Sequence, residues 1–116
     1  MEPMEAKIDT GADTGAMHCT KIREEMTESG PVLHFSPFDR PERNMTAHHY
    51  IVKSVRSSNG MSATRYYIDT TIRIHGEDYP IRLGLANRTE MKYQVLIGKR
   101  FLRQHGFVVD VSKKSQ

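Results

Sequence analysis

The fold is decided by a short segment in which a strand-like start with an apolar residue leads into a compact Asp-Thr-Gly: Lys7-Ile8-Asp9-Thr10-Gly11-Ala12. We expect a strand here that delivers the Asp9 carboxylate onto a tight turn. The Thr10 hydroxyl can hydrogen-bond locally, and Gly11 leaves room for another backbone to come close. An isolated Asp-Thr-Gly is most often an ordinary polar turn, so its meaning depends on what stands near the other end of the chain.

The same four residues follow directly as Asp13-Thr14-Gly15-Ala16. Four residues are too few to indicate a duplication. Only the first copy comes at the end of a strand-like apolar approach, so Asp9 is the better candidate for a fixed, aimed carboxylate.

The composition predicts one globular domain, residues 1–116, with a polar tail at about 112–116. No apolar run approaches the ~20 residues that cross a bilayer, and Met1–Glu5 lacks signal-peptide character. We therefore expect a cytoplasmic protein without membrane contact; a periplasmic location stays open if an export signal was removed. Cys19 is the only cysteine, which excludes an intrachain disulfide.

The first half of the chain predicts short strands between polar connections. Met17–Cys19 reads as a second short strand, and the charged segment Thr20–Ser29 as a helical turn or a solvated loop. Val32–Phe35 lies between prolines, which is typical of an edge strand. Tyr50–Val52 starts the next strand.

Two hairpins are predicted in the second half. Ser57–Gly60 contains Asn-Gly, a strong signal for a hairpin tip. In the strand that leaves it, every second residue is apolar or threonine: Ile68, Thr70, Ile72 and Ile74. His75–Asp78 turns the chain, and an alternating apolar set returns: Ile81, Leu83 and Leu85.

The C-terminal part predicts a buried strand followed by the only helix. Gln94–Gly98 is apolar and closed by glycine, the pattern of a strand covered on both sides. Lys99–His105 can form a short helix, with Gly106 as its C′ terminator. Phe107–Val111 is expected to be a final strand.

The two ends of the chain together resemble the retropepsins, single-domain aspartic proteases that work as homodimers. Their pattern is an apolar segment into Asp-Thr-Gly-Ala, here Asp9–Ala12, and later two apolar residues, glycine, a basic residue and a short helix, here Val95–Leu102. By the order of the elements, Val52–Arg65 would be the flap, and the hairpin Ile68–Leu85 would lie between the flap and the closing helix.

A bacterial retropepsin-like family, often labelled "ATP-dependent zinc protease", is a closer match. Its motifs stand here as Lys7–Ala12, Ala16–His18, Leu96–Lys99 and Phe107–Asp110, and the resemblance covers about Ala6 to Ser112. It implies a functional link to an ATP-grasp ligase that adds glutamates to a ribosomal protein, and cleavage of the resulting glutamate tails. Family members usually carry a basic residue where this chain has Asp13, and an acidic side chain there is unfavourable for such a substrate.

The resemblance implies an all-β, mostly antiparallel fold, a closed acid-protease barrel with one short C-terminal helix. It also implies a homodimeric aspartic endopeptidase that hydrolyses an extended, glutamate-rich protein tail through paired Asp9 carboxylates and an activated water. The catalytic residues would be Asp9, Thr10 and Gly11. The substrate-binding residues would be Ala12, Asp13, Ser58, Asn59, Gly60 and Arg65.

The residues predict neither a metal nor a cofactor. There is no His-Glu-x-x-His, no pair of Cys-x-x-Cys motifs and no phosphate-binding Gly-x-x-x-x-Gly-Lys-Ser/Thr loop, and the histidines are scattered. Four basic residues could meet an acidic substrate: Lys53, Arg56, Arg65 and Arg88. A catalytically inactive dimer that binds a peptide or protein is the main alternative. A basic barrel that binds nucleic acid is a third reading, disfavoured because basic residues do not cluster around aromatic ones.

Overall fold

The computed structural model describes residues 6–9, 11–38, 40, 44–56, 59–89 and 93–107. These residues form eight strands and one helix: β1 (Ala6–Asp9), β2 (Gly15–Thr27), β3 (Gly30–Pro37), β4 (Met45–Ala47), β5 (Ile51–Arg56), β6 (Ser62–Ile74), β7 (Glu77–Ala86), β8 (Val95–Gly98) and α1 (Lys99–Gln104). The prediction of an all-β fold with one short helix near the end is confirmed. Across the described ranges, no helix has the length and apolar character that a membrane span requires.

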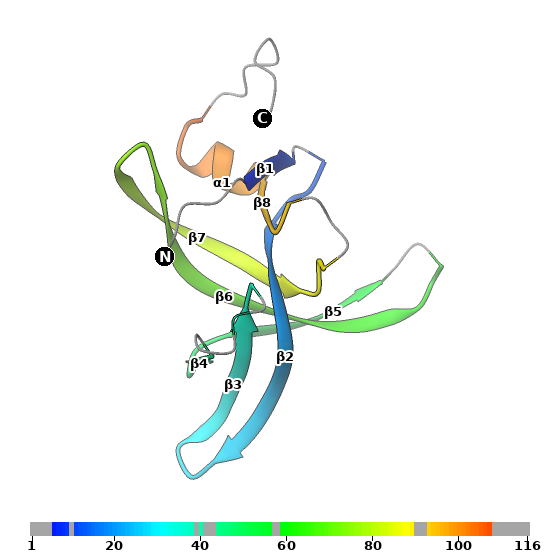
Figure 1. Cartoon of the computed structure of the whole chain (residues 1–116). Helices are drawn as coiled ribbons and strands as arrows, with labels where there is room; N and C mark the ends of the chain where they lie inside the picture. Colours follow the sequence, from blue (N-terminus) through cyan, green and yellow to red (C-terminus); the bar gives the residue numbers. More distant parts are fainter. Residues whose placement is uncertain are drawn as a thin grey trace.

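The strands form one mixed sheet in the order β1-β8-β2-β7-β6-β5, with β3 paired to β2 and β4 to β3. Only β1–β8 and β2–β7 pair in parallel, so the sheet is mostly antiparallel, as predicted. Figure 1 shows the sheet curled, with β1, β8 and α1 gathered at one end and the β2–β3 arm extending away from them. The pairing path of the described strands ends at β1 and β5, so this part of the barrel is a curled half-barrel.

The hydrophobic core lies inside the curl and joins the sheet to α1. Its buried members come from five strands and the helix: Met17, Cys19, Leu33, Phe35, Ile68, Ile81, Leu83, Leu85, Val95, Ile97, Phe101 and Leu102. The predicted alternation along β7 is confirmed, since Ile81, Leu83 and Leu85 are buried. β8 lies between β1 and β2 in the sheet, and its residues are buried except for half-buried Leu96, so the prediction of a covered strand is confirmed.

The prediction of a helical turn or loop at Thr20–Ser29 is wrong. β2 runs without interruption to Thr27 and pairs with β3 as far as Gly30, and only Glu28 and Ser29 form the turn. Lys21 has φ 54°, and the register shifts by one residue between Thr20 and Arg23. This bulge breaks the alternation that marks a strand, and pairing with β3 keeps a run of charged residues extended.

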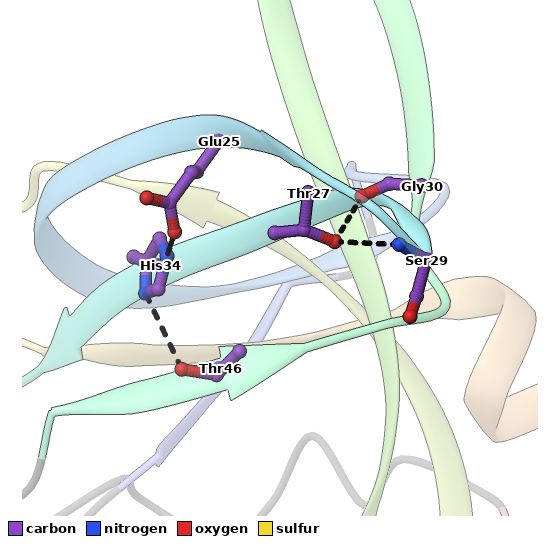
Figure 2. A network of polar contacts seen from close by, with 6 residues as sticks. All are labelled: Glu25, Thr27, Ser29, Gly30, His34 and Thr46. Carbon is purple, nitrogen blue, oxygen red and sulfur yellow. Dashed lines mark hydrogen bonds and ion pairs between the residues drawn. The ribbon is translucent and has the colours of Figure 1, made fainter.

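The prediction that Val32–Phe35 is an edge strand is also wrong. β3 pairs with β2 on one side and with β4 on the other, over Leu33–Phe35. Figure 2 shows His34 between the neighbouring strands, with Nε2 2.9 Å from Glu25 Oε1 and Nδ1 3.3 Å from Thr46 Oγ1. β4 has three residues and no periodic pattern that would have revealed it, and the prolines stand at the strand ends rather than along an exposed edge.

Both predicted hairpins are confirmed. β5 pairs with β6 from Ile51 to Arg56, and β6 pairs with β7 through the turn at His75 and Gly76, whose φ values are 51° and 82°. Two left-handed residues in succession are typical of the tight turn that suits a twisted hairpin. The predicted helix and terminator are confirmed too, since α1 ends at Gln104 and Gly106 has φ 72°. The predicted last strand lies outside the described residues beyond Phe107.

A carboxylate with two tyrosines ties the β2–β3 arm to the β5–β6 hairpin. Tyr50 donates its hydroxyl hydrogen to Glu24 Oε2 at 2.6 Å, and Tyr66 donates to Oε1 at 2.9 Å. The two rings meet edge to face with centroids 6.0 Å apart. The hydrogen bond from Tyr50 lowers the pKa of Glu24 the most, and the one from Tyr66 lowers it further. The hydrogen bond to Glu24 in turn raises the pKa of Tyr50 to about 12.

We expect this three-residue clamp to stabilise the fold only between acid and strongly alkaline pH. Because the folded chain lowers the pKa of Glu24, the unfolded chain binds more protons in acid, and the stabilisation is lost as the pH falls. Because folding raises the pKa of Tyr50, the tyrosine contribution is present at neutral pH and lost as the pH rises through about 12.

The measurement is the free energy of unfolding of wild type and Glu24→Gln in urea at about pH 7 and roughly pH 3, the pH values that bracket carboxylate titration. The variant is expected to be the less stable protein at pH 7 and nearly equal to wild type at pH 3. Glu28→Gln, in the exposed β2–β3 turn, is the matched control. An equal difference between wild type and Glu24→Gln at both pH values would contradict the clamp.

Candidate functional site

Asp9 stands at the end of β1, where the chain leaves the sheet. β1 runs parallel to β8, and Asp9 is paired in register with Gly98. The carboxylate is oriented by its own turn, because the Gly11 N–H donates to Asp9 Oδ1 at 3.0 Å and the Ala12 N–H donates to the Asp9 carbonyl at 3.2 Å. Asp9 is half-buried. An acceptor held in this way is fixed in direction and still within reach of solvent.

The segment after Asp9 is joined by backbone hydrogen bonds to the start of α1. Lys99 donates its N–H to the carbonyl of Ala12 at 2.9 Å, and Arg100 donates to the carbonyl of Asp13 at 3.0 Å. Residues from the two ends of the sequence therefore form one structural unit. The pairing of the two motifs that the sequence analysis joined has this physical basis.

Two glycines allow the close approach. A Cβ on Gly98 would lie 2.7 Å from the carbonyl oxygen of Asp13 and 2.8 Å from the amide nitrogen of Gly15. A Cβ on Gly15 would collide with the carbonyl oxygen of Leu96. All of these neighbours are backbone atoms: Gly15 and Leu96 lie in paired strands, and the Asp13 carbonyl accepts the N–H of Arg100, so they cannot move aside cheaply. Both positions require glycine for close packing.

Asp13, at a position where family members usually carry a basic residue, forms an ion pair with a residue of α1. Its Oδ2 is 2.8 Å from Nη2 of Arg100, and both side chains are more than half exposed, at 53% and 60%. The adjacent guanidinium offsets the negative charge beside the Asp9 turn. This contact lowers the net negative charge beside the turn, while Asp13 occupies one donor of Arg100.

The predicted flap residues lie on a separate hairpin. Asn59 and Gly60 form part of the β5–β6 turn, where Asn59 Oδ1 accepts the N–H of Met61 at 3.1 Å and Gly60 has φ 86°. Arg65 lies on β6 opposite Lys53. Figure 1 shows this hairpin projecting from the sheet, apart from the end of β1, so one copy of the chain does not bring the hairpin tip to Asp9. Thr10 and Ser58 lie outside the described residues.

Two of the basic residues considered for an acidic substrate have contacts within the protein. Arg88 donates from Nε to the carbonyl of Tyr93 at 3.1 Å, and its N–H donates to Nδ1 of His18 at 2.7 Å. His18 is fully buried. Lys53 places Nζ 5.4 Å from the centre of the Tyr67 ring. Arg88 thus links His18 on β2 to Tyr93, which precedes β8.

Among the described residues, no group of three or more His, Cys, Asp or Glu side chains is arranged to hold a metal ion. Burial raises the pKa of the Cys19 thiol to about 12, so this sulfur stays protonated and unreactive at neutral pH.

Sequence reasoning did not single out Arg82 and Arg100. Arg82 lies on the exposed face of β7 and forms a two-point contact with Asp69 on β6, at 2.8 and 3.1 Å. Asp69 and Arg82 are 13 residues apart and face each other across the strands, so the β6–β7 register, once predicted, would have paired them. Asp13 and Arg100 meet only through the tertiary fold, for which the sequence has no local signal.

The chain is similar in sequence to known proteins. A family model described as "RimB-like: Retropepsin-like aspartic endopeptidase RimB" matches residues 1–116. Two curated relatives, both named "Probable alpha-L-glutamate ligase", come from Shewanella pealeana and Shewanella halifaxensis; they are 31% and 30% identical over 101 residues, which is 83% of this chain. A protein of the same name from Parasynechococcus marenigrum is 28% identical. The matched region spans 22% of the length of these relatives.

A solved structure has a similar fold. The crystal structure of a Legionella pneumophila protein of unknown function superposes with a TM-score of 0.70 at 23% identity. The match covers 94% of this chain and 81% of the Legionella chain. At this identity the likeness supports the fold alone.

Proposed function

The chain belongs to the RimB-like family of retropepsin-like aspartic endopeptidases, and from this premise we propose that it is an aspartic endopeptidase that acts as a homodimer. The observation that carries the proposal is the Asp9 turn. One carboxylate is aimed by the Gly11 N–H, and its residue pairs in register with Gly98 at the end of a strand in the sheet. A single carboxylate cannot serve as both general acid and general base, so the second must come from another copy.

In the proposed dimer, the two Asp9 side chains meet across a two-fold axis. Carboxylates ~3 Å apart cannot both be ionised, so the pair holds one proton between them. The ionised member accepts a proton from a water as the water oxygen attacks the peptide carbonyl carbon. The protonated member donates its proton to the carbonyl oxygen. Collapse of the tetrahedral intermediate then breaks the C–N bond: the carboxyl that took the proton of the water gives it to the leaving amine nitrogen, and the other carboxylate takes back the hydroxyl proton as the C=O bond reforms.

The proposed substrate is an extended, glutamate-rich protein tail. Relatives named as alpha-L-glutamate ligases contain a region like this chain within a protein several times as long. A module that hydrolyses glutamate tails beside an enzyme named for glutamate ligation would form a reversible pair. We propose on this ground that an ATP-grasp glutamate ligase is the functional partner and that a polyglutamylated ribosomal protein is the target.

The experiment is incubation of the protein with a peptide that ends in several glutamates, with cleavage followed by mass spectrometry from about pH 4 to pH 8, a range that covers carboxylate titration. Cleavage within the tail is the expected result. Sedimentation at the assay concentration should find a dimer. A strictly monomeric protein that cleaves the peptide would contradict the two-copy mechanism, and a dimer that binds the tail without cleaving it would be the inactive peptide-binding module.

A further inference from the structure

A small recess of about 40 Å³ lies beside the segment that leads from Asp9 into β2. Its apolar side is made by Ile81 and Phe101, both buried, and its polar side by hydrogen-bond donors from three elements: Thr14, Arg82, Arg100 and Gln104. A single water needs roughly 10–15 Å³, so the recess has room for a carboxylate group. An apolar side facing a polar one suits the two methylenes and the carboxylate of a glutamate side chain.

The two arginines are already held in place. Asp69 accepts from Nε and Nη2 of Arg82 at 2.8 and 3.1 Å, and Asp13 accepts from Nη2 of Arg100 at 2.8 Å. A guanidinium has five N–H donors in a rigid plane, so each arginine retains donors beyond those that these bonds use. Ordering the side chains in advance lowers the entropic cost of binding an anion.

The charges around the recess have a positive excess. α1 contains Lys99, Arg100 and Arg103 and no acidic residue. With Arg82 this gives four positive side chains on α1 and β7, against two carboxylates, Asp69 and Asp13, that pair with Arg82 and Arg100. At physiological salt, exposed charges act over about 8 Å, so this excess attracts an anionic group even though each bridging arginine has a carboxylate partner.

We propose that this recess between Arg82 and Arg100 is a subsite that binds the side-chain carboxylate of a glutamate in the peptide substrate. The proposal deepens the proposed function and rests on it for the identity of the peptide. Thr14 and Asp13 belong to the same segment as the catalytic turn, so a peptide that crosses Asp9 can place one side chain in the recess. Asp13 competes with the ligand for Arg100 and thereby limits its affinity.

Binding is measured in the Asp9→Asn protein, so that the result does not depend on cleavage. The probes are labelled oligoglutamate and oligoglutamine peptides, both amidated at the C-terminus, and the readout is fluorescence anisotropy. Arg82→Gln and Arg100→Gln are each expected to weaken oligoglutamate binding roughly tenfold and to leave oligoglutamine binding unchanged, because a charge-assisted hydrogen bond is lost. Asp13→Asn should strengthen oligoglutamate binding, because it releases donors of Arg100.

Arg73→Gln is the matched control, since Arg73 forms the same two-point contact, with Asp78, at the far end of the β6–β7 hairpin. Thermal melts confirm that the variants are folded. Equal oligoglutamate affinity in the parent and in both recess variants would overturn the subsite, even if the wild type cleaves the peptide. Oligoglutamine with a free carboxyl terminus that binds as tightly as amidated oligoglutamate would also overturn it, because the ligand would then be the terminal carboxylate. Loss of affinity in the recess variants of a protein that never cleaves would support the subsite and reject the peptidase.

Discussion

Asp9→Asn is expected to reduce cleavage of the glutamate-tailed peptide by about 10⁴-fold, the scale of losses seen when a catalytic group is removed. Asparagine keeps the size of the side chain, and its Oδ1 can still accept the Gly11 N–H, a bond of 3.0 Å in the wild type. It cannot accept the proton of the attacking water. The loss should therefore appear in kcat, with the thermal midpoint nearly unchanged.

Asp78→Asn is the matched control, because Asp78 is an exposed carboxylate on the β6–β7 hairpin, which pairs with Arg73. Its activity should equal that of the wild type. If Asp9→Asn and Asp78→Asn cleave equally well across the pH range, Asp9 is not the catalytic carboxylate.

Apart from a substitution at Gly15, Gly98→Ala is expected to destabilise the protein more than alanine at any other described glycine. The new Cβ would lie 2.7 to 2.8 Å from backbone atoms of Asp13, Thr14 and Gly15, which would have to separate. Overpacking of this kind costs about 3 kcal/mol, which lowers the Tm by roughly 10–15 °C in a domain of this size. The separation also pulls the Asp9 turn away from β8, so, if Asp9 is catalytic as proposed, activity should fall further than stability alone requires.

Gly84→Ala separates this effect from a general intolerance of alanine in the sheet. Gly84 is also buried, but a Cβ there meets only side-chain atoms of Tyr67 and Arg65, at 3.1 to 3.4 Å. We expect a cost below about 1 kcal/mol, because those side chains can adjust. Melts are compared at one protein concentration, since association stabilises the folded state by mass action. Equal losses in the two variants would contradict the special role of Gly98.

The elements that the sequence predicted correctly are those set by local signals. Gly60, His75 and Gly76 mark the two hairpin turns by their left-handed conformations, and the alternation of Ile81, Leu83 and Leu85 depends only on the strand itself. β8 and α1 follow from an apolar run closed by a glycine. Each of these patterns stabilises the same structure whatever the rest of the chain does.

The errors come from tertiary pairing. Nothing local holds Thr20–Thr27 extended; the backbone of β3 does, across a bulge at Lys21. β3 is not an edge strand, because the three residues of β4 pair with its free side. In the candidate site, the contact of Asp9 with Gly98 follows from two recognisable motifs, whereas the contact of Asp13 with Arg100 requires the fold.

The central claim is that each active site needs an Asp9 from both copies of the chain. Wild-type and Asp9→Asn proteins are mixed at constant total concentration, allowed to exchange subunits, and assayed on the glutamate-tailed peptide. If both carboxylates are required, activity follows the square of the wild-type fraction, and an equal mixture retains about one quarter of the wild-type rate. An equal mixture that retains about one half, as expected if each copy works alone, or about three quarters, as expected if either Asp9 suffices in a dimer, would contradict the requirement for both carboxylates.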